Sequence, residues 1–387
     1  MGQLGIYIHI PFCVRKCVYC DFLSFPAEDA VKDAYMAALN EELKATAAFY
    51  GEYEVQTVFF GGGTPSCVAK EQIKDCLSTV RAHFHVADNA EITMELNPGT
   101  ASPESLEYLK DAGINRLSIG LQSADNRELR LLGRIHTYED FLATYEWARC
   151  AGYGNINVDL MSALPGQTPD TWFRTLQTVM ALEPKPEHIS AYSLMVEEGT
   201  PLFDQISQYP PLPDEETDRF LYHETKRLLA QQGYVRYEIS NYARKGFESR
   251  HNQIYWQRGC DHIRDYIGLG LGASTTVGNY RYQNTDNLAD YIRNSKRPDS
   301  LRCGEVFLTK QELMEEFVFL GLRRMEGISI SEFERTFGER LEQIWEKTLK
   351  KWSGAGCLAK KGGFWFLTEK GIDISNVVLA DFLSDTA

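Results

Sequence analysis

Three cysteines on one short loop constrain this chain more than any other feature of its sequence. Cys13, Cys17 and Cys20 stand at CxxxCxxC spacing directly after the alternating run Gly5–Pro11. Thiolates are soft ligands, and they suit zinc or an iron–sulfur cluster better than magnesium or calcium. A cluster of four irons normally takes four cysteines, so three cysteines leave one iron with an open position for a small chelating ligand.

The alternative to a cluster is a zinc site of the Cys₃His type, in which His9 or another histidine supplies the fourth ligand. Zinc loops usually come as two separated pairs of ligands, and the sequence contains no second pair. We therefore favour a redox cluster.

Length and charge limit the class of protein further. The 387 residues are enough for two or three domains, and no apolar run approaches the roughly 20 residues that span a bilayer. No signal peptide is visible, so we expect a cytoplasmic protein. The net charge of −14 argues against nonspecific binding to nucleic acid.

The cysteine count fits a metal site in a reducing compartment better than a disulfide framework, because nine is an odd number and three of the nine are crowded together. The other six show no ligand spacing, and we expect them to be small, buried hydrophobic side chains. These six are Cys67, Cys76, Cys150, Cys260, Cys303 and Cys357.

Short runs rich in Ile, Val, Phe and Tyr alternate with amphipathic stretches in the first half of the chain. The strand-like runs are Gly5–Ile10, Val55–Phe60, Glu91–Leu96, Arg116–Ile119, Ile156–Leu160 and His188–Leu194. Repeated βα units predict a parallel sheet, either open and doubly wound or forming a six-stranded barrel. In both architectures, ligands bind at the carboxyl ends of the strands.

The pattern changes after Pro201, where a proline-rich loop precedes a helical stretch. We expect residues 1–213 to form the βα part and residues 214–301 to form an extension, with long functional loops and short strands in 241–287. Residues 302–387 have helical periodicity and end in a hairpin around Gly362-Gly363, which predicts a winged-helix-like domain. Lysines near this hairpin raise the alternative of a DNA reader, but glutamates lie among them, and we expect no nucleic-acid partner.

Polar residues recur where the predicted strands end. The loop Gly61–Ser66 follows the second strand, and glycines there let a charged ligand approach bare backbone groups. Carboxylates suit the hydroxyls and ammonium of a ribose-bearing zwitterionic ligand, and an arginine fork suits its carboxylate. Each residue alone is more ordinary as a cap or a surface residue, so their shared position carries the prediction. They are Gly62, Gly63, Thr64, Glu95, Gln122, Arg134 and Asp159.

The stretch His251–Trp256 holds an imidazole, an amide and two aromatic rings. Imidazole is an axial haem ligand, and aromatic rings form walls of flat apolar pockets. From composition alone, a loop histidine among core aromatics is the favoured interpretation.

Taken together, these motifs resemble the radical S-adenosylmethionine superfamily and, within it, the HemN/HemW branch. The resemblance covers nearly the whole chain and implies an α/β fold, a partial (β/α)₆ barrel with a mainly helical C-terminal domain. It implies that Cys13, Cys17 and Cys20 hold a four-iron, four-sulfur cluster whose open iron chelates S-adenosylmethionine. By the same resemblance, the positions that contact S-adenosylmethionine are Tyr7, Phe22, Gly62, Gly63, Thr64, Glu95, Gln122, Arg134 and Asp159.

Two features point to the HemW side of that branch. Coproporphyrinogen dehydrogenases of the branch continue the motif to a fourth cysteine, where this chain has Phe22, and HemW-type proteins resemble this chain in carrying His-Asn-x-x-Tyr-Trp. The resemblance implies haem binding by His251, Asn252, Tyr255 and Trp256, and delivery of haem to respiratory proteins. This replaces the interpretation of His251 from composition.

The resemblance also leaves alternatives open. The chain is either a haem chaperone or a radical enzyme acting on a porphyrin, such as a coproporphyrinogen III dehydrogenase or a haem-modifying enzyme. It is either a monomer or a homodimer, with membrane respiratory enzymes as acceptors and peripheral attachment to the membrane as an option. The family's Gly-x-Gly-x-Gly-Ala-His segment ends here in Ser274, and His262, in a longer stretch before it, is a candidate substitute for the missing histidine.

Overall fold

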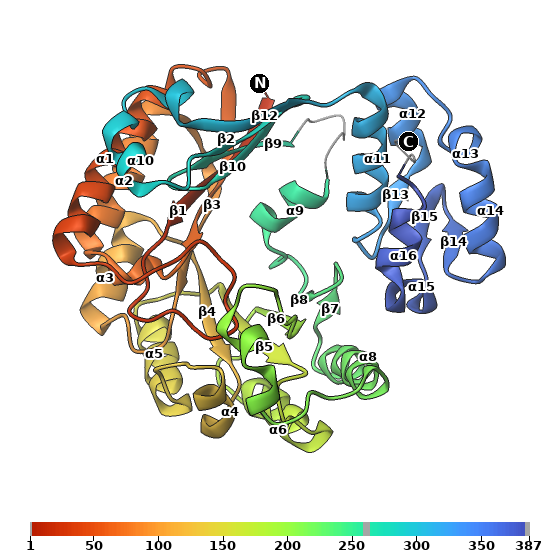
Figure 1. Cartoon of the computed structure of the whole chain (residues 1–387), viewed down its shortest axis with the longest axis horizontal. Helices are drawn as coiled ribbons and strands as arrows, with labels where there is room; N and C mark the ends of the chain where they lie inside the picture. Colours follow the sequence, from red (N-terminus) through yellow and green to blue (C-terminus); the bar gives the residue numbers. More distant parts are fainter. Residues whose placement is uncertain (1, 258–263, 384–387) are drawn as a thin grey trace.

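One large curved sheet forms most of the molecule, and a smaller group of helices with its own three-stranded sheet follows it (Figure 1). The computed structural model describes residues 2–257 and 264–383. Buried apolar side chains form one cluster within residues 4–301 and a second within residues 314–382. Each part therefore has its own core, while the three domain boundaries expected from the sequence stay predictions.

Within the described residues the large sheet has twelve strands in the order β12-β11-β10-β9-β1-β2-β3-β4-β5-β6-β8-β7. Strand β9 and strands β1 to β6 run parallel to one another, whereas the flanking strands β10 and β8 pair with them in antiparallel orientation. The order does not close on itself, which confirms the predicted α/β fold with a partial barrel. The six consecutive strands are β1 (Gly2–Ile10), β2 (Tyr53–Gly62), β3 (His85–Leu96), β4 (Arg116–Gln122), β5 (Ile156–Ser162) and β6 (His188–Ser193).

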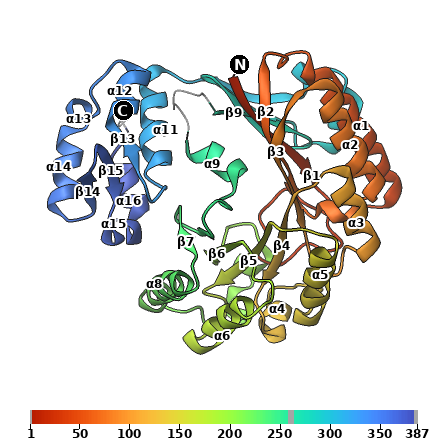
Figure 2. The same ribbon diagram turned by 180° about the vertical axis from the view of Figure 1, so that it is seen from behind.

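Helices connect these strands and cover the outer, convex face of the sheet (Figures 1 and 2). Several begin at a side-chain cap, such as Ser102, Thr137 and Thr168. The hydroxyl group of each cap accepts a hydrogen bond from an otherwise unpaired backbone N–H of the first turn. The connecting helices are α1 (Asp29–Ala47), α2 (Lys70–His83), α3 (Pro103–Ala112), α4 (Asn126–Leu131), α5 (Tyr138–Cys150) and α6 (Pro169–Met180).

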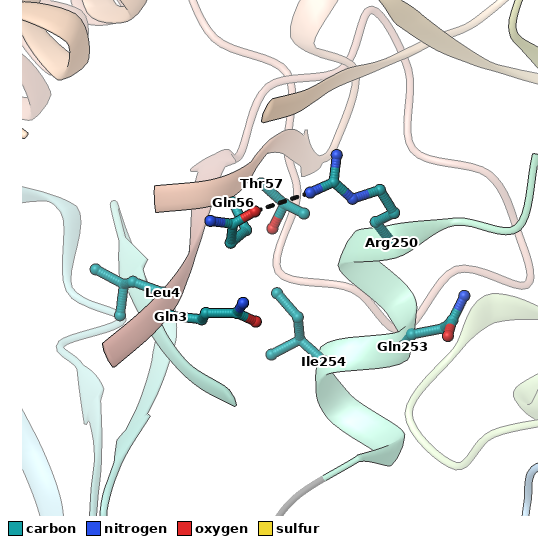
Figure 3. A pocket seen from close by; sticks show the side chains of 7 residues that line it. All are labelled: Gln3, Leu4, Gln56, Thr57, Arg250, Gln253 and Ile254. Atoms are coloured by element: carbon teal, nitrogen blue, oxygen red, sulfur yellow. Dashed lines mark hydrogen bonds between the residues drawn. The ribbon is translucent and has the colours of Figure 1, made fainter. Parts of the chain in front are cut away.

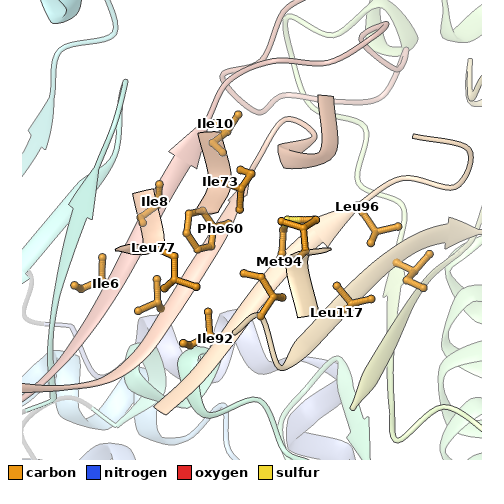
Figure 4. Packing of buried hydrophobic residues seen from close by; sticks show 14 of the residues in the cluster. Ile6, Ile8, Ile10, Phe60, Ile73, Leu77, Ile92, Met94, Leu96 and Leu117 are labelled. Carbon is orange, nitrogen blue, oxygen red and sulfur yellow. The ribbon is translucent and has the colours of Figure 1, made fainter. Parts of the chain in front are cut away.

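Alternation along each strand separates an apolar outer face from a polar inner face. Ile6, Ile8 and Ile10 of β1 pack in the buried cluster with Ile73 and Leu77 of α2 (Figure 4). Successive strand residues point to opposite faces, so Tyr7 and His9 face the interior of the barrel, where they line a cavity. The polar side chains that this pattern places inside the barrel form the candidate functional site.

An extension follows the sixth strand and widens the sheet on both sides. Helix α9 lies on the inner, concave side of the sheet, between it and the C-terminal helices (Figures 1 and 2), and contacts β2 and β9. The elements are α7 (Pro201–Asp204), α8 (Glu215–Gln231), β7 (Val235–Arg236), β8 (Asn241–Ala243), α9 (Arg250–Trp256), β9 (Arg264–Leu269), β10 (Ser274–Val277), β11 (Tyr280–Asn284), α10 (Leu288–Asn294) and β12 (Arg302–Phe307).

The C-terminal part combines helices with a small antiparallel sheet in the order β13-β15-β14, which agrees with the predicted winged-helix-like arrangement. Glu369 joins it to the barrel by ion pairs with Lys226 and Arg236. The elements are α11 (Lys310–Gly321), β13 (Ile328–Ser329), α12 (Ile330–Phe337), α13 (Leu341–Ile344), α14 (Glu346–Gly354), β14 (Leu358–Lys361), β15 (Phe364–Leu367), α15 (Glu369–Asp373) and α16 (Ser375–Ala380). None of the helices in the described ranges has both the length and the apolar character that a bilayer crossing requires.

Several local expectations were wrong. The short strands expected in 241–287 form as β8, β9, β10 and β11, but Arg250–Trp256 forms helix α9 where a loop was expected. The helical character expected of 302–387 holds from α11 onward, whereas Arg302–Phe307 forms the edge strand β12. Cys150 and Cys303 are exposed and Cys67 is half-buried, so among the described cysteines outside the loop only Cys76 and Cys357 are buried as expected. Cys260 and His262 lie outside the described residues.

Candidate functional site

The cysteine loop is held over the end of β1 by backbone hydrogen bonds to neighbouring loops. The N–H of Cys13 donates to Phe25 O, the N–H of Val18 donates to Leu132 O, and the N–H of Leu202 donates to Val18 O. These bonds tie the loop to segments that follow β4 and β6. All three thiols are half-buried at this end of the barrel.

Hydrogen-bond donors lie beside two of the three thiols, as expected where the thiols bind a metal as thiolates. The hydroxyl of Thr64 lies 3.5 Å from Cys13 Sγ, and Arg134 Nη1 lies 3.6 Å from Cys17 Sγ. A Cβ on Gly63 would stand 2.6 Å from the backbone oxygen of Phe12 and 3.0 Å from Cys13 Sγ, so only glycine fits there. Hydrogen bonds to the sulfurs tune iron–sulfur clusters, and the residues present therefore fit such a group.

The zinc alternative has less support from the geometry. Both ring nitrogens of His9 are engaged, Nδ1 with the hydroxyl of Tyr7 at 3.0 Å and Nε2 with Leu23 O at 2.9 Å. Across residues 2–257 and 264–383, no three His, Cys, Asp or Glu side chains are close enough to ligate one metal ion. His9 is thus a structural residue under the loop.

The strand-end residues meet near the cysteine loop. Arg134 Nη2 donates to Asn97 Oδ1 at 2.7 Å and to Gly120 O at 2.5 Å. Gln122 closes β4 with a φ of 71°, a left-handed conformation that costs a residue with a side chain about 1–3 kcal/mol. Such strain persists only where the surrounding structure enforces it, and here it lies beside the predicted cofactor residues.

Two cavities open from this end into the barrel, and Tyr7, Glu95 and Tyr255 line both of them. The first, which we call the mouth cavity, has a volume of about 450 Å³. It collects five of the predicted cofactor and haem residues, together with Ser274. Its lining is Tyr7, His9, Asp21, Phe22, Leu23, Gly62, Glu95, Tyr255, Tyr266, Gly272, Ala273, Ser274 and Gln283.

The second cavity, which we call the inner cavity, has a volume of about 210 Å³ and reaches between the strands. Asp159 lies here in the middle of β5 rather than at its end, so its expected position was wrong by a few residues. Its lining is Tyr7, Phe59, Glu95, Arg116, Ser118, Asn157, Asp159, Ser190, Tyr192, His251, Asn252 and Tyr255.

Glu95 is the buried carboxyl group between the two cavities. It accepts a hydrogen bond from the N–H of Gly62 at 3.2 Å. Burial, reinforced by the nearby Asp159, raises the pKa of Glu95 to about 8. This carboxyl therefore carries a proton at neutral pH and can both donate and accept hydrogen bonds to a ligand hydroxyl or ammonium.

His251 is enclosed in the wall of the barrel. Its Nδ1 lies 2.7 Å from the hydroxyl of Thr57, its Nε2 lies 2.9 Å from the hydroxyl of Tyr255, and its ring stacks on Phe59. Burial, with a smaller contribution from Arg116, lowers the pKa of His251 to about 3. The imidazole is neutral, and Tyr255 separates its Nε2 from the mouth cavity.

Of the four residues in the predicted haem motif, only Trp256 lies apart from the others. Asn252 lines the inner cavity, whereas Trp256 lines neither cavity and lies under the guanidinium of Arg323, 4.6 Å from its ring centre. The structure thus brings His251, Asn252 and Tyr255 together and places Trp256 at the junction with α11.

A third cavity of about 250 Å³ lies at the amino ends of β1 and β2, behind helix α9 (Figure 3). Arg250 is anchored there by a hydrogen bond from Nη2 to Gln56 Oε1 at 3.0 Å. Thr57, the partner of His251, lines it, but none of the predicted site residues does. His251 therefore lies between this rear cavity and the barrel interior.

Sequence reasoning missed the polar residues inside the barrel. Arg116, Ser118, Asn157 and Ser190 all line the inner cavity. They lie within the strands and not at the carboxyl ends of the strands, and the signal that marks them is their alternation with apolar residues in buried strands.

Comparisons with known proteins agree with this geometry. The model of the radical SAM superfamily matches residues 7–179, and the model of the HemN C-terminal domain matches residues 308–374. A heme chaperone HemW of Bacillus subtilis is 34% identical over 98% of this chain and 99% of its own length. The heme chaperone HemW of Escherichia coli is 35% identical over 100% of this chain and 99% of its own length.

A solved structure has the same architecture. The coproporphyrinogen III oxidase HemN of Escherichia coli, a radical SAM enzyme, superposes with a TM-score of 0.86 at 25% identity. The match covers 98% of this chain and 90% of that one. The barrel and the C-terminal helices therefore recur together in that oxidase.

Proposed function

This chain belongs to the family of radical SAM proteins that includes the heme chaperones HemW, and we propose that it binds haem and delivers it to haem-dependent respiratory proteins. The observation that carries the proposal is the near full-length similarity to relatives of that name. Phe22, which lines the mouth cavity in place of a fourth cysteine, supports the same side of the branch.

The cofactor set follows from the donors at the carboxyl ends of the strands. Cys13, Cys17 and Cys20 would hold a four-iron, four-sulfur cluster, with Thr64 and Arg134 donating to two of the thiolates. S-adenosylmethionine would bind in the mouth cavity beside Tyr7, Gly62 and Glu95, as the sequence motifs imply. When bound, the cluster supplies an electron to S-adenosylmethionine.

For haem, the motif on α9 provides the His251 imidazole as the iron ligand, and the phenol of Tyr255 covers that imidazole. His251 Nε2 lies 2.9 Å from the hydroxyl of Tyr255, which lines the mouth cavity, and that hydroxyl must move away before the nitrogen reaches an iron. Because the pKa of His251 is about 3, protons do not compete with iron at neutral pH. Aromatic rings of Phe22 and Tyr266 line the same cavity and suit a flat macrocycle.

A haem titration followed by optical spectroscopy tests this proposal. Wild-type protein should bind one haem per chain, and His251→Ala should change or abolish the spectrum of the bound form. Tyr255→Phe removes the hydroxyl that occupies Nε2, so it should bind haem at least as fast as wild type. Failure of the wild type to bind haem, or an unchanged spectrum in His251→Ala, would contradict the proposal.

A second candidate is a radical enzyme that acts on a porphyrin. It is favoured by the likeness to HemN and by the inner cavity, which shares Tyr7, Glu95 and Tyr255 with the mouth cavity. Anaerobic incubation with reductant, S-adenosylmethionine and coproporphyrinogen III, analysed by chromatography, decides between the two. A vinyl product would favour the enzyme, whereas haem binding without turnover would favour the chaperone.

A further inference from the structure

Arg116 is a buried cation to which the roles described so far assign nothing. It is the first residue of β4 and its relative exposure is 2%, yet it lines the inner cavity. Its Nε has no hydrogen-bond partner, and no hydrogen bond or ion pair of its guanidinium is found within the part of the chain that the structure describes.

Glu95 and Asp159 line the same cavity as this guanidinium, but within the described residues neither carboxyl group is hydrogen-bonded to it. Removing a charge from water is costly unless hydrogen bonds and an opposite charge replace the hydration. The planar fork of arginine matches a carboxylate with two parallel hydrogen bonds. The geometry therefore prepares the inner cavity for a ligand carboxylate.

The charges around Arg116 leave room for that anion. Asp159 already accepts hydrogen bonds from Ser118 at 2.9 Å and from Asn157 at 2.8 Å. Burial raises the pKa of Glu95 to about 8, so this group is uncharged at neutral pH. Asn252 and Ser190 add neutral polar groups to the lining.

The size of the inner cavity indicates what part of a ligand enters it. Pockets that enclose whole drug-sized ligands measure about 300–1,000 Å³, and the inner cavity measures about 210 Å³. It is too small for a tetrapyrrole ring but wide enough for a short acidic arm. The neighbouring mouth cavity, with about 450 Å³, falls within the range for larger ligands.

The carboxylate of S-adenosylmethionine is a poor match for this position. Under the proposed function it chelates the open iron beside the cysteines, which follow the carboxyl end of β1. Arg116 opens β4 and Gln122 closes it, and seven strand residues span about 20 Å. One carboxylate does not serve both ends of the strand.

Haem has two propionate arms, and each ends in a carboxylate. We propose that Arg116 binds a propionate carboxylate of the tetrapyrrole, with the propionate arm in the inner cavity and the macrocycle outside it on the mouth side. The inference rests on the proposed function and deepens it, because it identifies the group that orients the ligand. It applies equally to a porphyrin bound as cargo or as substrate.

The test removes the carboxylate from the ligand and the guanidinium from the protein in turn. Haem and haem dimethyl ester are titrated in the same detergent buffer into wild-type protein, Arg116→Gln, Arg116→Lys and the surface control Arg293→Gln, whose side chain is 70% exposed. In wild type and in the control, esterification should weaken binding by about 10- to 100-fold, the range for a charge-assisted hydrogen bond. In Arg116→Gln the two ligands should bind alike, and Arg116→Lys should recover part of the difference.

The outcomes separate this inference from the proposed function. Equal binding of haem and its ester by wild type, or an undiminished preference in Arg116→Gln, would overturn the carboxylate site and leave the chaperone proposal standing. No binding of either ligand by wild type would contradict the proposed function, and the propionate site with it. If Arg116→Gln does not fold, the comparison of the two ligands in wild type and Arg116→Lys still decides.

Discussion

At the scale of single residues, the site depends on the missing side chain of Gly63 as well as on the side chains that are present. Gly63 lies against the backbone of Phe12 and the sulfur of Cys13, and a Cβ there would stand 2.6 Å from the carbonyl oxygen of Phe12. Backbone atoms cannot rotate away as a flexible side chain can. Gly63 thus sets the distance between the second strand and the cysteine loop.

Gly63→Ala should therefore impair cluster assembly. Loss of supporting contacts around metal ligands typically weakens binding by roughly 10- to 100-fold, and we expect a similar effect here. Iron and sulfide per chain, measured after anaerobic reconstitution, provide the readout. Gly51→Ala is the matched control because no atom lies within 4 Å of its added Cβ; equal iron content in both variants would refute the expectation.

At the scale of elements, a buried carboxyl group on α1 holds the loop after β9. Glu42 accepts hydrogen bonds from the N–H of Gly270 at 2.8 Å, from Asn284 Nδ2 at 2.6 Å and from the hydroxyl of Tyr291 at 2.5 Å. Tyr35 reinforces the contact by accepting from the N–H of Leu271 at 3.0 Å. The loop continues into Gly272–Ser274, which line the mouth cavity.

Glu42→Gln should loosen this loop, because the amide NH₂ would replace one of the two oxygens that accept hydrogen bonds from Gly270, Asn284 and Tyr291. Leaving a buried donor unpaired costs about 1–3 kcal/mol. Hydrogen exchange at Gly270 should accelerate accordingly. The neighbouring Glu41→Gln is the control, since Glu41 faces solvent and pairs with Lys44; unchanged exchange at Gly270 in Glu42→Gln would show that the loop is held by other contacts.

At the scale of the whole molecule, buried carboxyl groups should make stability depend on pH. Burial raises the pKa of Glu42 to about 7 and that of Glu95 to about 8, from an ordinary value of 4.5. In the unfolded chain both groups lose their protons at a lower pH than in the folded protein. Their contribution to stability is therefore complete below the unfolded pKa and is lost as the pH rises through the folded values.

We expect the thermal midpoint of the protein without added ligands to fall between about pH 6.5 and 8, by the equivalent of about 1–2 kcal/mol for each glutamate. The buried histidines His9, His136, His188 and His251, whose pKa values burial lowers, oppose this trend only in its lower part, because their unfolded imidazoles are still partly protonated near pH 6.5 and are neutral in both states above about pH 7.5. Glu95→Gln should flatten the slope, whereas Glu107→Gln, an exposed position on α3, should not. A midpoint that rises over this range would contradict the assignment.

Much of the fold follows from local pattern. The apolar runs Gly5–Ile10 and Val55–Phe60 act within single elements, and both strands form where expected. The errors arose where long-range pairing decides: Arg302–Phe307 becomes a strand only because β11 supplies its partner. His251 lies on a helix whose apolar face packs inside the barrel, and no periodicity in seven residues reveals that.

The sequence alone determined the chemistry available to this protein: three thiols at cluster spacing, a glycine loop beside them, and a phenylalanine where a related enzyme family has a fourth cysteine. Those signals are local, because ligand spacing and backbone freedom are properties of a few neighbouring residues. Only the tertiary structure decided which polar groups share a cavity, because strands distant in sequence must align before Arg116, Asp159 and His251 meet. The same alignment placed His251 behind Tyr255 and, within residues 2–257 and 264–383, left the guanidinium of Arg116 without a hydrogen-bonded partner.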